Sequence, residues 1–212
     1  MSLVARFDAD FARCPLVAIL RGVRPDEVVA IGEELVDAGF TLIEVPMNSP
    51  DPLDSVARLA KALGDRAMVG AGTVLGPADV ARVRDAGGSL VISPNANLDV
   101  IGATAAAGMV SLPGIFTPTE AFAALAAGAT ALKLFPAEAA PPAVVKAQRA
   151  VIPRDVPLIV VGGVSPDKMA AYRAAGADGF GLGSSLYRPG QSAAEVGASA
   201  AAFVAALGEG KE

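Results

Sequence analysis

Short apolar runs alternate with longer amphipathic segments along the whole chain. The runs are almost continuously hydrophobic, which is typical of strands buried on both faces of a parallel sheet. They predict strands at 17–20, 41–45, 68–72, 90–93, 109–112, 131–134, 158–161 and 179–182. The segments between them have helical spacing and predict helices at 25–38, 50–63, 77–86, 98–107, 118–127, 142–151, 166–175 and 192–207.

Glycine and proline mark the ends of these predicted helices. An Ala-Gly pair closes five of the helices, as in Asp37-Ala38-Gly39 and Asp85-Ala86-Gly87, where the left-handed position after a helix costs glycine little. Proline opens six of them, because its missing N–H is not needed in the first turn. Ser49, Thr117 and Ser165 precede such prolines and are expected N-caps.

Eight strand–helix alternations predict an α/β fold, a (β/α)8 TIM barrel in a single domain spanning residues 1–212. The segment 3–13 adds an N-terminal extra helix that is expected to cross the barrel bottom. An open doubly wound sheet is the alternative, but no GxGxxG follows the first strand, which weakens a dinucleotide-binding interpretation. In a barrel, the active site lies at the carboxyl ends of the strands.

The amino-acid composition excludes several kinds of catalytic site and binding partner. The chain has no histidine, so Ser-His and Cys-His triads and histidine-rich zinc sites are excluded, and lysines and carboxylates must carry acid–base chemistry. A net charge of -5 argues against nucleic acid or an anionic membrane as partner. Although 53% of residues are hydrophobic, no apolar run approaches the roughly 18 residues of a membrane span. The single cysteine, Cys14, is interpreted as structural, and a cytoplasmic location is expected.

Lys133 is unusual because it is the only one of five lysines that falls on a predicted strand. Apolar neighbours disfavour the charged amine and lower its pKa, and a neutral amine is a nucleophile towards ketones. The alternative is a lysine at a strand end that extends its charge to water.

Glu44 lies within the second predicted strand, where a carboxylate is costly unless it is paired. A purely structural explanation for Glu44 is an ion pair with Lys133 or Arg21. The structural and the catalytic interpretation therefore both place this carboxylate next to a basic residue. Arg21 directly follows the first strand, and its guanidinium suits a carboxylate or phosphate, although a surface arginine is equally consistent. An amine and a carboxylate that converge at the barrel mouth suit Schiff-base chemistry.

Small residues end several strands. Gly162-Gly163 follows the seventh strand and Gly183-Ser184 the eighth, where barrels often bind phosphate through backbone N–H groups. Each turn alone is also explained as an ordinary turn. Gly70-Ala71-Gly72-Thr73 ends the third strand, and tight packing is the preferred explanation for its glycines.

These residues together resemble the class I aldolases of keto-deoxy-phospho-sugar acids. The resemblance covers residues 15–191 and is carried by the motifs Ile19-Leu20-Arg21-Gly22, Ile43-Glu44-Val45-Pro46, Gly70-Ala71-Gly72-Thr73-Val74, Ser93-Pro94-Asn95, Leu132-Lys133-Leu134-Phe135-Pro136, Val161-Gly162-Gly163-Val164 and Gly181-Leu182-Gly183-Ser184. It implies Lys133 as Schiff-base lysine, Glu44 as general acid/base, Arg21 and Thr73 at the substrate carboxylate, and Gly162, Gly163, Gly183 and Ser184 at the phosphate. It also implies a homotrimer that needs no metal or cofactor and acts on a phosphorylated keto sugar acid.

The family has two close branches, which act on 6-phosphogalactonate and 6-phosphogluconate forms that differ at C4. Met47-Asn48-Ser49-Pro50 and the segment 186–191 resemble the galactonate branch, whereas Pro136-Ala137-Glu138 resembles the gluconate branch. The resemblance therefore implies cleavage of 2-dehydro-3-deoxy-6-phosphogalactonate to pyruvate and D-glyceraldehyde 3-phosphate, with the gluconate epimer or dual specificity as the alternative. A different phosphate-binding barrel enzyme and a non-catalytic sugar-phosphate sensor are the other classes, and neither requires Glu44 and Lys133 to face each other.

Overall fold

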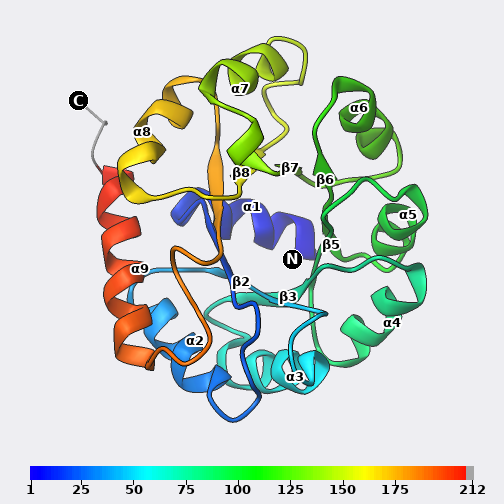
Figure 1. Ribbon diagram of the computed structural model, residues 1–212. Helices are drawn as coiled ribbons and strands as arrows, with labels where there is room; N and C mark the ends of the chain where they lie inside the picture. The colour runs from blue at the N-terminus through cyan, green and yellow to red at the C-terminus, as the bar shows by residue number, and fades with distance from the viewer. Residues whose placement is uncertain (209–212) are drawn as a thin grey trace.

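Parallel strands form a ring that is wrapped by helices in the computed structural model, which describes residues 1–208 (Figure 1). The strands are β1 (Leu16–Ile19), β2 (Leu42–Pro46), β3 (Met68–Gly72), β4 (Leu90–Ile92), β5 (Val110–Leu112), β6 (Gly114–Ile115), β7 (Leu132–Leu134), β8 (Leu158–Val161) and β9 (Gly179–Leu182). The helices are α1 (Leu3–Arg13), α2 (Val28–Asp37), α3 (Pro52–Leu63), α4 (Pro77–Asp85), α5 (Leu98–Ala106), α6 (Pro118–Ala126), α7 (Pro142–Arg149), α8 (Pro166–Ala174) and α9 (Ala193–Gly208), with a short 3-10 turn η1 (Ala137–Ala139).

The sheet follows the order β5-β4-β3-β2-β1-β9-β8-β7-β6, and every paired strand is parallel. The two ends of this order meet, because the Ser111 carbonyl of β5 accepts hydrogen bonds from the Thr130 and Ala131 N–H groups at 2.9 and 3.3 Å. The predicted α/β barrel with an N-terminal extra helix is therefore confirmed. The single-domain assignment stays a prediction.

The structure has nine strands where the sequence predicted eight, because the fifth strand is interrupted at Pro113. Proline has no N–H to contribute to the ladder. β5 consequently pairs with β4 and β6 with β7, while the Pro113 carbonyl still accepts a hydrogen bond from the Lys133 N–H at 2.9 Å. The strands at 68–72, 158–161 and 179–182 have their predicted bounds, and the others differ by a residue.

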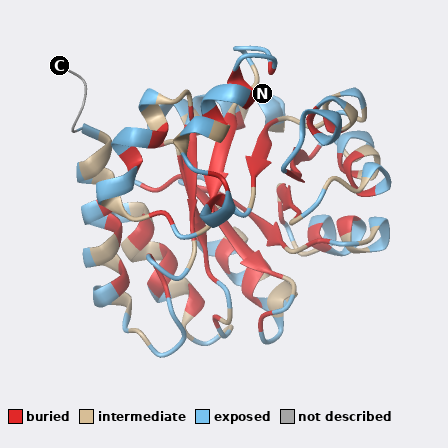
Figure 2. Ribbon diagram, turned by 45° about the horizontal axis from the view of Figure 1, so that its top comes forward, coloured by how far each residue is buried: buried red, intermediate tan, exposed pale blue. Residues whose placement is uncertain are grey.

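Two apolar layers explain why the strands are continuously hydrophobic. Alternate residues point to opposite faces of a strand, so in β1 Leu16 and Ala18 pack under the helices while Val17 and Ile19 fill the barrel interior. The strands are buried, and the exposed residues lie mainly on the outer faces of the helices (Figure 2).

The helix α1 crosses the barrel at the amino ends of the strands, as predicted (Figure 1). Its Phe7 is completely buried among the interior side chains and stacks on Phe11, with ring centroids 5.4 Å apart. The buried Asp10 forms ion pairs with Arg6 and Arg13 within the helix. This end of the barrel is thus closed, which leaves the opposite end for ligands.

Five of the eight helices predicted after the first strand begin at the predicted residue, whereas only α3 ends at the predicted residue. Thr117 forms the expected N-cap and, with Glu120, a capping box. Ser165 occupies the N-cap position without capping through its side chain. Ser49 was wrongly predicted as a cap, because α3 begins at Pro52 and the Ser49 hydroxyl instead accepts the Gly22 N–H at 2.9 Å.

The helix predicted at 25–38 begins only at Val28, since residues 25–27 form a turn. Cys14 is buried, as a structural cysteine should be, and burial raises the pKa of its thiol to about 11. Across residues 1–208, none of the helices combines the length and the apolar character that a membrane span requires.

Candidate active site

Lys133 occupies the middle of β7 with its side chain in the barrel interior. Its neighbours Leu132 and Leu134 pack outward under the helices, as strand alternation predicts. Only 7% of Lys133 is exposed, and the ring centroid of Phe135 lies 5.1 Å from its Nζ. Burial lowers the pKa of Lys133, and the nearby charge of Arg21 lowers it further, while Glu44 opposes the shift. The amine is therefore easier to deprotonate than a lysine in water, which favours nucleophilic attack.

Glu44 in β2 lies on the same interior as Lys133. It is 2% exposed, and burial raises the pKa of its carboxyl although Lys133 and Arg21 pull that pKa down. Both residues line a small cavity of about 10 Å³ whose walls are otherwise apolar. Within residues 1–208 no ion pair shorter than 4.0 Å joins them, and Glu44 Oε2 has no hydrogen-bond partner. The carboxyl thus shares the cavity with the amine and keeps one oxygen without a hydrogen-bond partner.

Gly72 provides the space for this carboxyl. A Cβ added to Gly72 would collide with Glu44 Oε2 and would lie 2.9 Å from Oε1. The glycine ends β3, which pairs with β2 in a register that joins Gly72 to Pro46. The sequence suggested only tight packing for this glycine, and the structure identifies the group against which it packs.

Arg21 and Thr73 line the cleft above Lys133. Arg21 lies just beyond β1 and donates a hydrogen bond to Asn48 Oδ1 at 2.8 Å. Thr73 directly follows β3 with a backbone φ of +55°, a conformation that is uncommon for a residue other than glycine. Both residues line the same cleft as Lys133, where Arg21 contributes a positive charge and Thr73 a hydroxyl group.

The two predicted phosphate turns meet on the other side of this cleft. Gly162 and Gly163 follow β8 with φ of +118° and +60°, and Gly183 and Ser184 follow β9. The Ser185 hydroxyl donates to the Val164 carbonyl at 2.7 Å and so ties the two turns together. All four predicted residues line one cleft of about 510 Å³ that also contains Lys133.

Seven of the eight predicted site residues thus line a single cleft, and Glu44 lies in the small cavity below it next to Lys133. Two charged residues of the cleft had no predicted role. Arg188 points its guanidinium at the turn after β9, where Nε donates to the Ser184 carbonyl at 2.9 Å. Glu138 on η1 also lines the cleft. Arg188 could have been found from the sequence, because it follows Ser184 by four residues and a cation at that spacing lies near the glycine turn.

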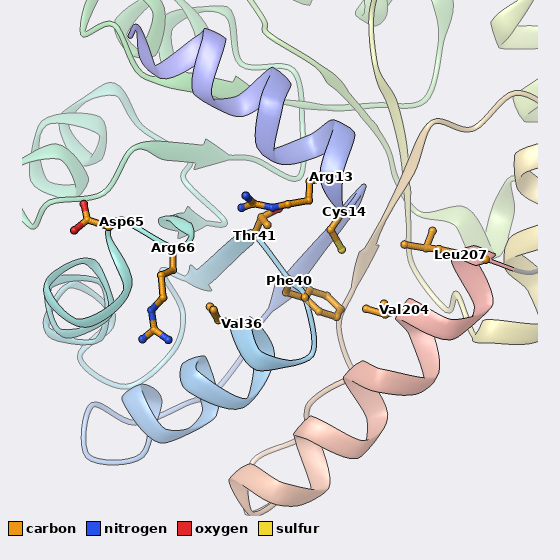
Figure 3. A pocket seen from close by; sticks show the side chains of 11 residues that line it. Arg13, Cys14, Val36, Phe40, Thr41, Asp65, Arg66, Val204 and Leu207 are labelled. Atoms are coloured by element: carbon orange, nitrogen blue, oxygen red, sulfur yellow. The ribbon is translucent and has the colours of Figure 1, made fainter.

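Another hollow lies at the opposite end of the barrel (Figure 3). It is formed by segments that precede β1, β2 and β3 and by the end of α9, including Cys14, Phe40 and Leu207. Its arginines Arg13 and Arg66 are paired with Asp10 and Glu33. This hollow shares no lining residue with the cleft at the carboxyl ends of the strands. In residues 1–208 no three acidic or cysteine side chains gather in a metal-binding arrangement.

Comparison with known proteins gives consistent results. A curated protein of Rhizobium meliloti (strain 1021) named "Probable 2-dehydro-3-deoxy-6-phosphogalactonate aldolase" is 50% identical over 91% of each chain. The "2-dehydro-3-deoxy-6-phosphogalactonate aldolase" of Escherichia coli (strain K12) is 47% identical over 93% of this chain and 96% of its own. The solved "Native KDPGal structure" is 47% identical, superposes with a TM-score of 0.91, and covers 93% of this chain and 96% of its own.

Relatives named for the gluconate substrate are more distant. The "2-dehydro-3-deoxy-phosphogluconate aldolase" of Pseudoalteromonas atlantica is 32% identical over 76% of this chain and 75% of its own. The sequence profile described as "Aldolase: KDPG and KHG aldolase" matches residues 7–197. Because this profile spans almost the whole barrel and the identities extend over nearly the full length, the chain belongs to the KDPG and KHG aldolase family.

Proposed function

We propose that this chain is a class I aldolase that cleaves 2-dehydro-3-deoxy-6-phosphogalactonate to pyruvate and D-glyceraldehyde 3-phosphate. The observation that carries the proposal is the Lys133 amine, which is buried, has a lowered pKa and shares a cavity with Glu44. The relatives that are 47–50% identical carry the galactonate name, which supports the choice of substrate.

The proposed reaction begins with attack of the neutral Lys133 Nζ on the C2 ketone. Glu44 donates a proton to the carbinolamine hydroxyl, which leaves as water and forms a protonated imine. Removal of the C4 hydroxyl proton then sends the C3–C4 electrons into the imine, which releases glyceraldehyde 3-phosphate and leaves an enamine. Protonation at C3 and hydrolysis give pyruvate and the free lysine.

The remaining residues position the substrate. Arg21 and Thr73 hold the carboxylate next to the imine, and the turns of Gly162-Gly163 and Gly183-Ser184 hold the phosphate. Fixing both ends of the substrate places the C3–C4 bond next to the amine, an orientation effect that can be large. Arg188 adds a cation to the phosphate side of the cleft.

Trapping with borohydride tests the nucleophile. Pyruvate and borohydride should leave a stable adduct on Lys133, located by peptide mass spectrometry, and should abolish activity. Lys133→Ala should show neither adduct nor turnover, whereas Lys146→Ala, which changes an exposed lysine of α7, should behave as the wild type. An adduct at another residue would refute the assignment. An isomerase, a phosphoribosyl-type synthase or a non-catalytic sensor would form no adduct at all.

The gluconate epimer is the second candidate substrate, because Pro136-Ala137-Glu138 resembles the gluconate branch. The two substrates differ at C4 alone. Comparison of kcat/KM for the two epimers separates the candidates, and the galactonate form should give the higher value.

We also propose a cytoplasmic homotrimer. Four of the exposed large hydrophobic side chains lie on one side of the barrel, at the starts of α4 and α5 and on or before α6 (Figure 1): Leu75, Leu98, Phe116 and Phe122. Contact with further copies of the chain would remove this apolar surface from water. A reducing compartment suits a chain whose single cysteine is buried.

A further inference from the structure

Glu138 packs against both glycines of the turn after β8. A Cβ added to Gly162 would lie 3.1 Å from Glu138 Cδ, and a Cβ added to Gly163 would lie 3.0 Å from Oε1. The same three residues line both the active-site cleft and a neighbouring hollow at the start of α8. The glutamate therefore stands directly at the glycine turn.

The position of this glutamate is fixed by a neighbouring helix. The Tyr172 hydroxyl of α8 donates to the carbonyls of Ala137 and Ala140 at 3.3 and 3.2 Å, which holds η1 against α8. Tyr172 is buried, and its pKa is raised by that burial and further by the charge of Glu138. A segment tied in this way keeps the Glu138 backbone next to the turn.

The charge of Glu138 is unusual for this location. Arg21, Lys133 and Arg188 are the basic residues that line the cleft, and Glu138 is the one acidic residue that lines it in the described part of the chain. No lysine or arginine of residues 1–208 forms an ion pair with its carboxylate. Lys168 is the cation at the same turn, where its ammonium donates to the Gly163 carbonyl at 3.1 Å. A phosphate dianion bound there would meet the Glu138 carboxylate as well as this ammonium, and the carboxylate lowers its affinity.

We propose that Glu138 is a specificity-determining residue that limits how tightly the glycine turns hold a phosphate group. The inference rests on the proposed function. Before cleavage the substrate is held by the imine, its carboxylate and its phosphate, so it stays bound in spite of the repulsion between its phosphate and the Glu138 carboxylate. After cleavage the aldehyde phosphate is held by the phosphate turns alone, so the same repulsion speeds its release. Inorganic phosphate likewise has no other anchor and is kept from occupying the cleft.

Packing is the competing explanation, in which Glu138 only fills the space beside two glycines. Glu138→Gln separates the two, because it keeps the shape of the side chain and removes its charge. Glu138→Ala removes both the charge and most of the side chain. Asp8→Asn, on the exposed face of α1 at the other end of the barrel, removes one carboxylate of the same sign and serves as the matched control.

The experiment measures inhibition by inorganic phosphate and KM for the sugar acid with and without its phosphate. In Glu138→Gln, the inhibition constant of inorganic phosphate and KM for the phosphorylated substrate should each fall roughly three- to tenfold, as expected for one partly screened charge acting on a dianion. KM for the unphosphorylated substrate should not change. The difference should shrink at high salt, and Asp8→Asn should match the wild type.

Three results would overturn the inference. Wild-type constants in Glu138→Gln, with impaired constants only in Glu138→Ala, would show that Glu138 acts by packing. Weaker phosphate inhibition in Glu138→Gln would show that the glutamate helps phosphate to bind. If the wild-type enzyme itself does not distinguish the two substrates, the phosphate turns are misassigned and the inference falls with them, whereas Lys133 trapping would be unaffected.

Discussion

At the scale of single residues, the candidate site depends on a carboxyl that fits only because a neighbouring residue has no side chain. The Glu44 carboxyl occupies the space where a Cβ of Gly72 would be, on the adjacent strand. Its position opposite Lys133 is therefore set by two strands together. A small change at Gly72 should disturb proton transfer without touching either titratable residue.

Gly72→Ala should displace the Glu44 carboxyl and lower kcat, by about a hundredfold if general acid–base catalysis is lost. The matched control is Gly102→Ala in α5, where an added Cβ meets nothing within 4 Å and removal of a helix-interior glycine should stabilise the fold by roughly 0.5–1 kcal/mol. Steady-state kinetics and thermal unfolding check both variants. Wild-type turnover in a folded Gly72→Ala protein would contradict the role of Glu44.

The placement of Lys133 near Glu44 followed from the sequence, because strand periodicity fixes which residues share a face and a buried charge is costly unless it is paired. The fit of Glu44 on Gly72 did not, since it depends on the path of a side chain between two strands. Glu138 and Arg188 were missed as cleft residues because they lie outside the strands, on η1 and between β9 and α9. Their exposed segments carry no periodic pattern that would place them.

At the scale of elements, hydrophobic patterning predicted the strands well and proline was the source of the main difference. Pro113 splits the fifth strand because it contributes no N–H to the ladder, although the run 109–112 looked uninterrupted. The start of α3 shifted from residue 50 to Pro52 for a different reason. Ser49 has a side chain that suits an N-cap, but the loop folds back and the Ser49 hydroxyl accepts a hydrogen bond from the Gly22 N–H.

The helix α1 was predicted with its observed bounds, and its energetic role follows from burial. Phe7 is completely buried in the barrel interior, so Phe7→Ala should destabilise the protein by about 3–5 kcal/mol. Val4 of the same helix is 41% exposed, so Val4→Ala should have little effect. Denaturant unfolding measures both. Because the candidate active site lies at the other end of the barrel, folded Phe7→Ala should keep its kcat. A loss of kcat with unchanged stability would contradict the separation of the stabilising end of the barrel from the catalytic end.

At the scale of the whole molecule, assembly should depend on the apolar side formed by Leu75, Leu98, Phe116 and Phe122. Phe122 is 47% exposed on α6, and burial of its ring between copies of the chain would remove a large apolar surface from water. Phe122→Asp would place a charge in that contact, so we expect the variant to dissociate while the barrel itself stays folded.

Val151→Asp is the matched control, because Val151 is 52% exposed after α7 and lies outside this side. Analytical ultracentrifugation should give a trimer for the wild type and for Val151→Asp, and smaller species for Phe122→Asp with unchanged circular dichroism. Equal dissociation of both variants would place the interface elsewhere. A monomeric wild type at micromolar concentration would refute the trimer, and the exposed phenylalanines would then require a different partner.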